Sequence, residues 1–261
     1  MPTWNAGQYL KFSDQRTQPC RDLVARISIA DPASIIDLGS GPGTSTTVLA
    51  HRWPQAEITG LDSSTAMLEA ARQALPACQW IMGDIAAWAQ AAGKQYDIVC
   101  SNAALQWLPN HASLYPQCFA HVAPGGAFAV QVPANMDAPA NRLMRELAAG
   151  PSWRKRFASE VPEWHVHDAP FYYDLLAPYA ERLDIWYTEY IHVMPDVESI
   201  VEWYKGSGLR PFLEALPAQA EREGFTADYL DAVRKAYPAR PDGRVLFPFR
   251  RLFLIAYRAS R

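Results

Sequence analysis

The sequence predicts an α/β fold built on a mostly parallel sheet, and two observations support this. Residues 35–43 begin as a short apolar run and end in three glycines at alternate positions. An apolar run suits a central strand that is covered on both faces, and glycines allow a sharp turn into a helix. Strand and helix patterns then alternate as far as Val132, which is typical of strands joined by crossover helices.

Composition limits the classes of protein that the chain can belong to. With 261 residues, 49% of them hydrophobic, it can form one large domain with a sizeable core. A formal net charge of −3 disfavours a nucleic-acid binder that relies on bulk positive charge. The four cysteines lack the close pairs of a metal site or disulfide framework. With neither a signal-peptide pattern nor an apolar run of membrane-spanning length, we expect a cytoplasmic protein without membrane contact.

The glycine turn is the first candidate binding site. Its pattern is Asp37-x-Gly39-x-Gly41-x-Gly43, and Thr44 stands where a dinucleotide fingerprint has its third glycine. A nicotinamide-dependent oxidoreductase is therefore disfavoured. A ligand against the turn and an ordinary tight turn both remain open from the glycines alone.

The elements up to residue 133 follow in order. We expect a helix near Gln18–Ile27 with Pro19 in its first turn, and another over Thr44–Trp53. Ser63 or Ser64 should cap a third helix that carries Met67 on its apolar side. The expected strands after the first are 57–62, 79–82, 96–100 and 127–132, with a turn at 122–126 before the last of them.

Polar residues follow several of these strands and should face one crevice at the carboxyl edge of the sheet. Asp62 lies about 20 residues beyond the glycine turn, where a carboxylate can accept hydrogen bonds from both ribose hydroxyls of an adenosine. A solvated strand-end acid is the alternative. Asn102 and Gln106 can form hydrogen bonds without adding charge, and Trp107 could simply belong to the core.

The alternation ends after Pro133. Residues 134–178 are rich in aromatic, proline and charged residues, and 193–245 have a helical pattern. Two late strands are expected at 183–191 and 251–257. Residues 4–16 suit either an amphipathic segment packed on the surface or a flap over a cofactor.

The ordered acidic and glycine motifs resemble those of class I S-adenosylmethionine (SAM) methyltransferases. Further blocks make the chain similar, over nearly its whole length, to the trans-aconitate 2-methyltransferase family: Trp4-Asn5, Arg52-Trp53-Pro54, Leu105-Gln106-Trp107-Leu108-Pro109, Leu143-Met144-Arg145-Glu146, Tyr172-Tyr173-Asp174, Gly208-Leu209-Arg210-Pro211 and Arg251-Leu252-Phe253. This resemblance implies a Rossmann-like sheet, mostly parallel, with a C-terminal antiparallel hairpin. It also implies a single domain over 1–261, with helical cap insertions near 134–178 and 193–245.

The resemblance also implies a reaction and its site: methyl transfer from SAM to a carboxylate of trans-aconitate, with S-adenosylhomocysteine as product and without a metal. Asp84 would bind the adenine amino group while Ile85 packs on the ring. The full set of expected cofactor residues is Tyr9, Asp37, Gly39, Gly41, Asp62, Ser63, Met67, Asp84, Ile85 and Asn102. Asn102, Gln106 and Trp107 would align the reactants.

Binding of a small polycarboxylate would require arginines, because a guanidinium fork matches a carboxylate. The leading candidates for binding the acceptor are Arg210 and Arg251, and the further candidates are Arg142, Tyr173, Arg145 and Arg250. Two alternatives remain: a SAM methyltransferase for another small carboxylate or hydroxyl, and a non-catalytic SAM-binding protein.

Overall fold

The computed structural model describes residues 13–157 and 164–260, and within this range the chain divides into two compact units. The larger unit contains residues 13–133, 164–188 and those from 251 onward. The smaller unit contains the described residues of 134–163 and 189–250. Of the two segments expected to form cap insertions, 134–157 and 193–245 fall in the smaller unit, whereas 164–178 fall in the larger one. The expected features at residues 4–12 lie outside the described residues.

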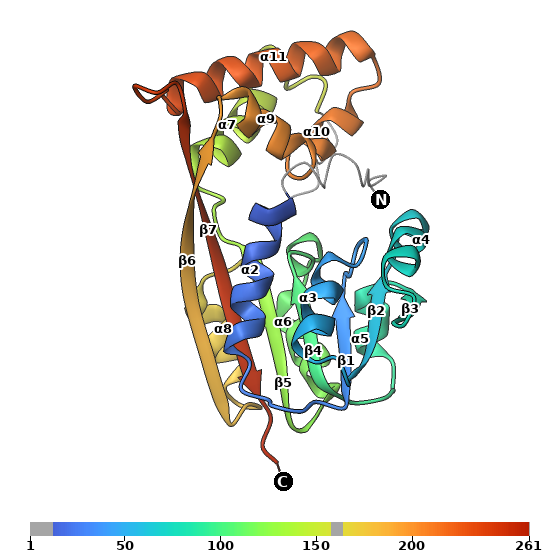
Figure 1. Ribbon diagram of the computed structural model, residues 1–261. Coiled ribbons are helices and arrows are strands. Elements are labelled where there is room, and N and C mark those ends of the chain that lie inside the picture. The colour runs from blue at the N-terminus through green and yellow to red at the C-terminus, as the bar shows by residue number, and fades with distance from the viewer. Residues whose placement is uncertain (1–12, 158–163, 261) are drawn as a thin grey trace. The chain divides into compact units, whose positions relative to one another are not determined.

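A seven-stranded sheet is the centre of the fold, with the order β3-β2-β1-β4-β5-β7-β6 (Figure 1). Its strands are β1 (Ser34–Leu38), β2 (Glu57–Asp62), β3 (Gln79–Met82), β4 (Tyr96–Asn102), β5 (Val122–Pro133), β6 (Arg182–Met194) and β7 (Val245–Tyr257). Strands β1 to β5 pair in parallel, whereas β7 pairs antiparallel with β5. The predicted fold class, a mostly parallel sheet with antiparallel C-terminal strands, is therefore confirmed.

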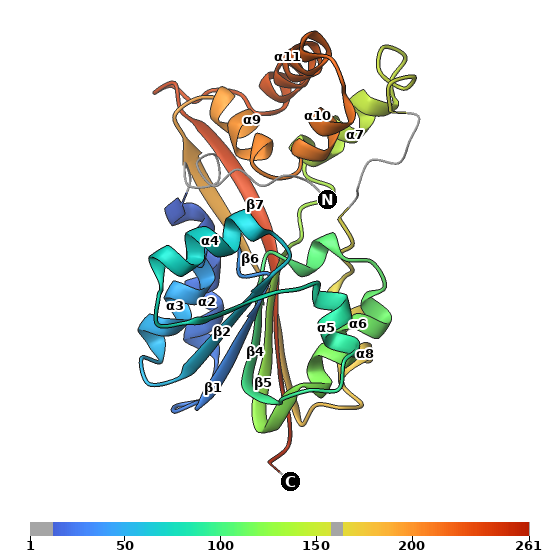
Figure 2. The same ribbon diagram turned by 90° about the vertical axis from the view of Figure 1, so that its right-hand side faces the viewer.

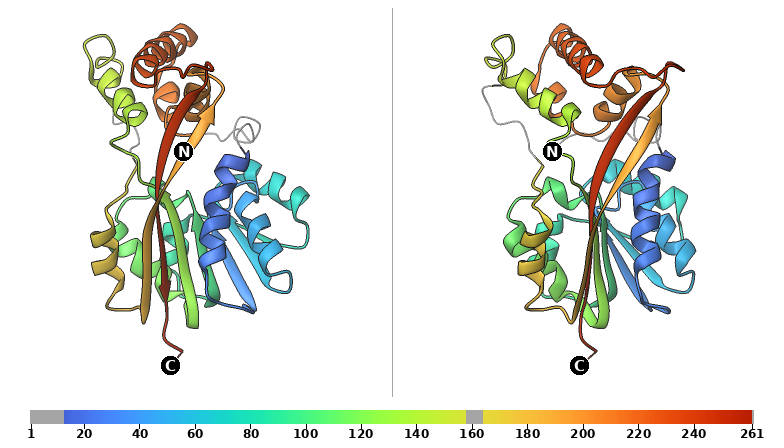
Figure 3. Two further views of the ribbon diagram at one scale, coloured as in Figure 1. Left: turned by 60° about the vertical axis from the view of Figure 1, so that its left-hand side comes forward. Right: turned by 90° about the vertical axis from the view of Figure 1, so that its left-hand side faces the viewer.

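Helices cover both faces of the sheet in the larger unit. One face carries α2 (Ser13–Arg26), α3 (Thr44–Arg52) and α4 (Thr65–Ala74), and the other carries α5 (Ile85–Gln90), α6 (His111–Ala120) and α8 (Ala169–Leu176) (Figure 2). Figure 3 shows the sheet separating the blue α2 and α3 from the green and gold α6 and α8. Ile35 and Ile36 on adjacent positions of β1 are both fully buried, as a strand covered on both faces requires.

Two local expectations were wrong. Helix α2 begins at Ser13, so Pro19 lies inside the helix and not in its first turn. The proposed turn at 122–126 is part of β5, which already pairs at Val122 with Tyr96 and is irregular where the register shifts between Tyr96 and Ile98. Gly125 has a φ of 77° there. The irregularity absorbs the Pro-Gly-Gly residues without ending the strand.

The smaller unit is largely helical, as predicted for 193–245. Its helices are α7 (Pro139–Ala149), α9 (Glu198–Lys205), α10 (Arg210–Ala215) and α11 (Gln219–Ala236). Helix α11 contacts α7 and α9. The core of the smaller unit includes the fully buried side chains of Tyr204, Phe225, Tyr229 and Phe247. The buried hydroxyls have partners: Tyr229 donates to the carbonyl of Ala140, at 3.0 Å. Among the described residues, no helix is both long and apolar enough to cross a membrane.

Gly60 provides a test of packing in the sheet. It lies on β2 beside Trp80 of β3, and a Cβ on Gly60 would overlap the indole ring. We expect Gly60→Ala to lower the free energy of unfolding by about 1–3 kcal/mol, as overpacking usually does. Gly83→Ala is the matched control, because its Cβ would meet Leu61 only at an ordinary 3.6 Å. Urea denaturation measures both, and equal stabilities for the two variants would contradict the packing.

Candidate functional site

The glycine turn between β1 and α3 is the centre of the site. Gly39, Gly41 and Gly43 all adopt left-handed conformations, with φ of 73°, 53° and 88°. This explains the three glycines, because other residues rarely adopt such angles. The amide of Gly39 donates to the carbonyl of Leu61, at 2.8 Å, and so ties the turn to the end of β2. Gly43 then serves as the N-cap residue of α3.

The turn is crowded at one glycine and open at another. A Cβ on Gly39 would overlap the Cβ of Ala104, and Ile85 Cδ1 would lie 3.5 Å away. At Gly41 a Cβ would meet nothing within 4 Å. The chain after β4 therefore packs directly against the start of the turn, while its middle leaves open space along the backbone. Ala104 is a site residue that sequence reasoning missed, since an alanine carries no chemical signal.

Asp62 is held beside this open stretch by two backbone amides. Its Oδ2 accepts from the amide of Gly41 and its Oδ1 from the amide of Ser64, both at 2.8 Å. A carboxylate has about four lone-pair sites, so each oxygen retains capacity for another donor. The structure thus brings Asp62 to the glycine turn, as its spacing predicted, and fixes its orientation.

Asp37 lies behind the turn and is fully buried. Its Oδ2 accepts hydrogen bonds from Ser45, at 2.6 Å, and Thr46, at 2.7 Å. Burial raises the pKa of Asp37 to about 6, although these two hydrogen bonds oppose the rise. Desolvation is therefore the larger effect. The Asp37 carboxylate joins β1 to the first turn of α3. The hydroxyl residues Ser45 and Thr46, close after the glycines, were the signal in the sequence for this connection.

The remaining cofactor candidates lie at the starts of two helices. Asp84 caps α5, its Oδ1 accepting from the amide of Ala87, at 2.9 Å, and Ile85 is buried beside Gly39. Ser64, and not Ser63, caps α4 through the amide of Met67. Met67 is buried on α4, whereas Ser63 is exposed. Tyr9 lies outside the described residues.

The loop after β4 carries buried amide groups. Asn102 ends the strand, and its Oδ1 has no hydrogen-bond partner among the described residues; the same holds for Oε1 of Gln106. Gln106 Nε2 donates to the carbonyl of Ala103, at 2.7 Å, and Ala103 is left-handed with a φ of 54°. Trp107 packs edge-on against Trp164, at 5.7 Å between ring centroids. Unused acceptors at a strand end suit a ligand with hydrogen-bond donors or positive charge.

Arg251 is, with Arg16 on α2, one of two buried arginines among the described residues of the larger unit, and 4% of its surface is exposed. Its Nη1 donates to Oε1 of Gln131, at 3.3 Å. Gln131 pairs in register with Asn102 across β4 and β5, so the three side chains share the carboxyl edge of the sheet. Sequence reasoning named Asn102 and Arg251 but missed Gln131, which the same strand-end argument could have found. Tyr173, the other candidate in this unit, is 55% exposed.

The other candidate arginines belong to the smaller unit and are paired on its helices. Arg142 pairs with Glu146, at 3.2 Å, and Arg210 with Glu214, at 2.8 Å. Arg145 donates to the carbonyl of Met136, at 2.8 Å. An exposed pair such as Arg142–Glu146 contributes little to stability, whereas the Arg210 side chain is only 13% exposed; neither pair requires or excludes a ligand role.

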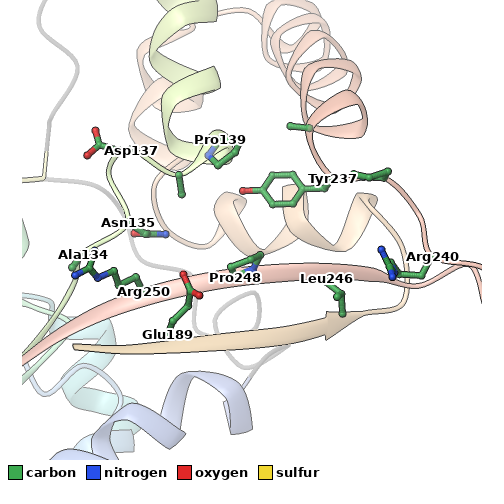
Figure 4. Close-up of a pocket in the computed structure, with 13 residues that line it drawn as sticks. Ala134, Asn135, Asp137, Pro139, Glu189, Tyr237, Arg240, Leu246, Pro248 and Arg250 are labelled. Atoms are coloured by element: carbon green, nitrogen blue, oxygen red, sulfur yellow. The ribbon is translucent and has the colours of Figure 1, made fainter. Parts of the chain in front are cut away.

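A pocket of about 530 Å³ lies within the smaller unit (Figure 4). Its wall includes Arg250 together with Arg240, and the carboxylates of Glu189 and Asp137 line it as well. The mixture of charges does not single out a polyanion. Arg250 therefore has a place beside a pocket, but this pocket lacks the uniformly cationic lining that a tricarboxylate would favour. Among the described residues, no cluster of His, Cys, Asp or Glu could hold a metal ion.

Comparison with known proteins agrees with the sheet and the turn. A family model described as a methyltransferase domain matches residues 35–126. A solved structure of the YcgJ protein from Bacillus subtilis has a TM-score of 0.60 at 12% identity, with 94% of this chain and 100% of that chain covered. A putative methyltransferase from Bacillus halodurans has a TM-score of 0.58 at 13% identity, with 93% and 99% covered. The solved structures show that the fold is shared, and the family model indicates a methyltransferase domain over the residues that it matches.

Full-length relatives specify the family. A trans-aconitate 2-methyltransferase of Azoarcus sp. (strain BH72) is 51% identical over 258 residues, with 99% of this chain and 100% of the relative covered. Another, from Paracidovorax citrulli, is 44% identical over 261 residues, with 100% of both covered. The chain belongs to the trans-aconitate 2-methyltransferase family.

The raised pKa of Asp37 predicts a pH-dependent stability. The folded state binds the proton of the Asp37 carboxyl more tightly than the unfolded chain does. The contribution of this carboxyl to the free energy of unfolding is therefore complete below about pH 4 and is lost as the pH rises to about 6. Relative to the parent, Asp37→Asn should gain up to about 3 kcal/mol across that interval and level off above it. Urea denaturation at a series of pH values measures the difference. Asp31→Asn, at an exposed loop position, is the control, and a difference that is flat with pH for Asp37→Asn would contradict the assignment.

Proposed function

We propose that this protein transfers the methyl group of SAM to a carboxylate of trans-aconitate, giving a monomethyl ester and S-adenosylhomocysteine. The names of its full-length relatives support the acceptor. The observation that carries the proposal is a buried guanidinium, Arg251, at the same sheet edge as the loop that touches the glycine turn. Its four free cysteine thiols suit the cytoplasmic location that we also propose.

The residues around the turn fit SAM. Gly41 leaves space for a ligand along the backbone, and Asp62 can accept the two ribose hydroxyls. Asp84 and Ile85 would hold the adenine, and the neutral amide oxygens of Asn102 and Gln106 suit a cationic neighbour. Ser63 and Met67 complete the set at the start of α4, and Tyr9 remains a candidate. Asp37, which is bound to α3, would act by shaping the turn.

The chemistry needs no general base from the protein. When bound, SAM supplies an electrophilic methyl group, and a substrate carboxylate with a pKa near about 4 is already ionised at neutral pH. The side chains therefore have to align the reactants and exclude water, and alignment can contribute up to about 7–11 kcal/mol in the best cases. Among the described residues, Gln106 and Asn102 supply neutral oxygens for this purpose, with Trp107 alongside.

Arg251 is our leading anchor for the acceptor. A guanidinium forms two parallel hydrogen bonds with a carboxylate, and the attraction between opposite charges strengthens where water is excluded. Arg251 is buried at the strand ends and its bond to Gln131 helps to fix its orientation, so its guanidinium is suited to bind a carboxylate of the acceptor there. Arg210, Arg142 and Tyr173 remain secondary candidates.

One experiment separates this function from its alternatives. The protein is incubated with SAM and a panel of small polycarboxylates and hydroxy acids, and methyl esters are detected by mass. Methylation of trans-aconitate in preference to the others supports the proposal. Preference for another acceptor favours a related methyltransferase, and binding of S-adenosylhomocysteine without turnover on any acceptor favours a non-catalytic SAM-binding protein.

Replacement of Asp62 should weaken cofactor binding. Asp62→Ala removes charge-assisted hydrogen bonds worth about 1.5–3 kcal/mol each, so we expect the affinity for S-adenosylhomocysteine to fall at least tenfold. Isothermal titration calorimetry measures it, with Glu69→Gln on an exposed position of α4 as the control. Parental affinity in Asp62→Ala would remove Asp62 from the cofactor site.

Arg251→Lys should affect the acceptor and spare the cofactor. Lysine keeps the charge but loses the planar fork, so we expect the KM for trans-aconitate to rise about tenfold or more while S-adenosylhomocysteine binds as before. Arg234→Lys, at an exposed pair with Glu198 and outside the candidate residues, is the matched control. Steady-state kinetics with each substrate varied in turn measures both. Parental KM in Arg251→Lys would mean that the acceptor is anchored elsewhere.

A further inference from the structure

A buried histidine outside the proposed binding residues supports the loop after β4. His111 is the first residue of α6 and is 1% exposed. Its Nδ1 lies 2.8 Å from the hydroxyl of Tyr172 on α8, and its Nε2 lies 3.0 Å from the carbonyl oxygen of Leu105. Leu105 begins the short 3-10 helix η1 (Leu105–Trp107), which carries Gln106. Helices α6 and α8 lie on the same face of the sheet (Figure 2).

The hydrogen bonds determine the tautomer of His111. A carbonyl oxygen can only accept, so Nε2 carries the hydrogen and donates it to Leu105. In the neutral ring Nδ1 must then accept, and the hydroxyl of Tyr172 donates to it. The Tyr172 oxygen itself accepts from the amide of His167, at 3.2 Å. In the neutral ring, each group in this chain of three hydrogen bonds therefore has a definite role.

The turn held by His111 is connected to the glycine turn. The carbonyl of Gln106 accepts from the amide of His165, at 2.7 Å, and its side chain donates to Ala103. Ala103 is bound in turn to the carbonyl of Gln131, at 2.9 Å, and its neighbour Ala104 is the residue that lies against Gly39. A displacement of η1 would therefore change the contact between Ala104 and Gly39.

The backbone here needs such support. Among the described residues other than glycine, Ala103 and Asn110 are the two with positive φ, at 54° and 60°, and they bracket the loop. The left-handed conformation is unfavourable for residues with a side chain, more so for Ala103 than for an asparagine, so surrounding contacts must hold it in place. His111 directly follows Asn110, and its hydrogen bond to Leu105 holds the loop between Ala103 and Asn110.

We propose that His111 is a positioning residue for methyl transfer, whose Nε2–H holds the Leu105–Trp107 turn and thereby keeps Ala104 against Gly39 and Gln106 beside the end of β4. The inference rests on the function proposed above. His111 acts through Leu105 and not by contact with a reactant. If His111 has this role, binding of the cofactor depends on the neutral form of the His111 imidazole.

The role of His111 should depend on pH. Burial lowers its pKa; the hydrogen bond to Leu105 opposes this shift, and the nearby His167 and His165 add to it. Tyr115 on the same helix, and Tyr172 and Asp168 on α8, are the other titratable groups of the cluster. A protonated ring presents N–H groups on both sides and can no longer accept from Tyr172. The stabilising arrangement is therefore complete above the ordinary histidine pKa of about 6.5 and is lost as the pH falls through the lowered pKa.

Two amide substitutions separate the two ring nitrogens. The glutamine amide reaches about as far as Nε2 and can donate to Leu105, whereas the asparagine amide reaches only about as far as Nδ1 and can accept from Tyr172. His111→Asn should weaken binding of S-adenosylhomocysteine about tenfold and lower kcat at least as much, and His111→Gln should restore most of both. Binding of S-adenosylhomocysteine by the parent should weaken as the pH falls through the lowered pKa of His111. This acid limb should be absent in His111→Gln.

His121→Asn is the matched control. His121 is buried on the same face at the C-terminal end of α6, where it stacks on Trp88 and faces the carbonyls of Ala89 and Lys94. We expect its loss to lower stability without changing binding of S-adenosylhomocysteine or its pH profile. Equal defects in His111→Asn and His111→Gln, parental behaviour in both, or a defect in His121→Asn equal to that of His111→Asn would overturn the proposal. Calorimetry needs no acceptor, so it tests His111 even if trans-aconitate is not methylated, in which case only the proposed function fails.

Discussion

The contact between Gly39 and Ala104 is the constraint on which the site depends. Gly39 has a left-handed φ and no room for a side chain, because the loop after β4 occupies that space. A side chain at position 39 would clash with this loop, so the turn and the loop fit together as observed only with glycine there. In this arrangement the glycine turn, the Asp62 carboxylate and the buried amides of the loop are parts of one packed unit and not separate motifs.

Electrostatics around the turn combine opposing effects. Burial of Asp37 costs more than its two hydroxyl partners return, as its raised pKa indicates. Asp62 lies at the more accessible side and is held by backbone amides, which stabilise a negative charge without introducing a positive one. The acidic site is thus compatible with a cationic ligand, whereas the guanidinium of Arg251 places positive charge at the neighbouring strand ends. Each sign of charge has a separate place along one edge of the sheet.

Features encoded locally could be predicted, and features that depend on distant contacts could not. The bounds of β2 and β3 follow from apolar runs between turn residues, and the glycines predicted a sharp turn, which the structure forms with three left-handed angles. Pro19 suggested a helix that starts near Gln18, but the helix begins six residues before Pro19. Ser64 and Ser63 were indistinguishable from spacing alone. The pairing of His111 with Tyr172 joins residues 61 positions apart, and no short-range pattern indicates it.

The position of β7 has a consequence for synthesis on the ribosome. In the sheet β7 lies between β5 and β6, although it is the last of the seven strands to be made. Until residues 245–257 emerge, the edge of β5 has no strand beside it on that side and β6 has no neighbour in the sheet. The nascent chain must keep an apolar strand edge from pairing with other chains while more than a hundred residues after β5 are added.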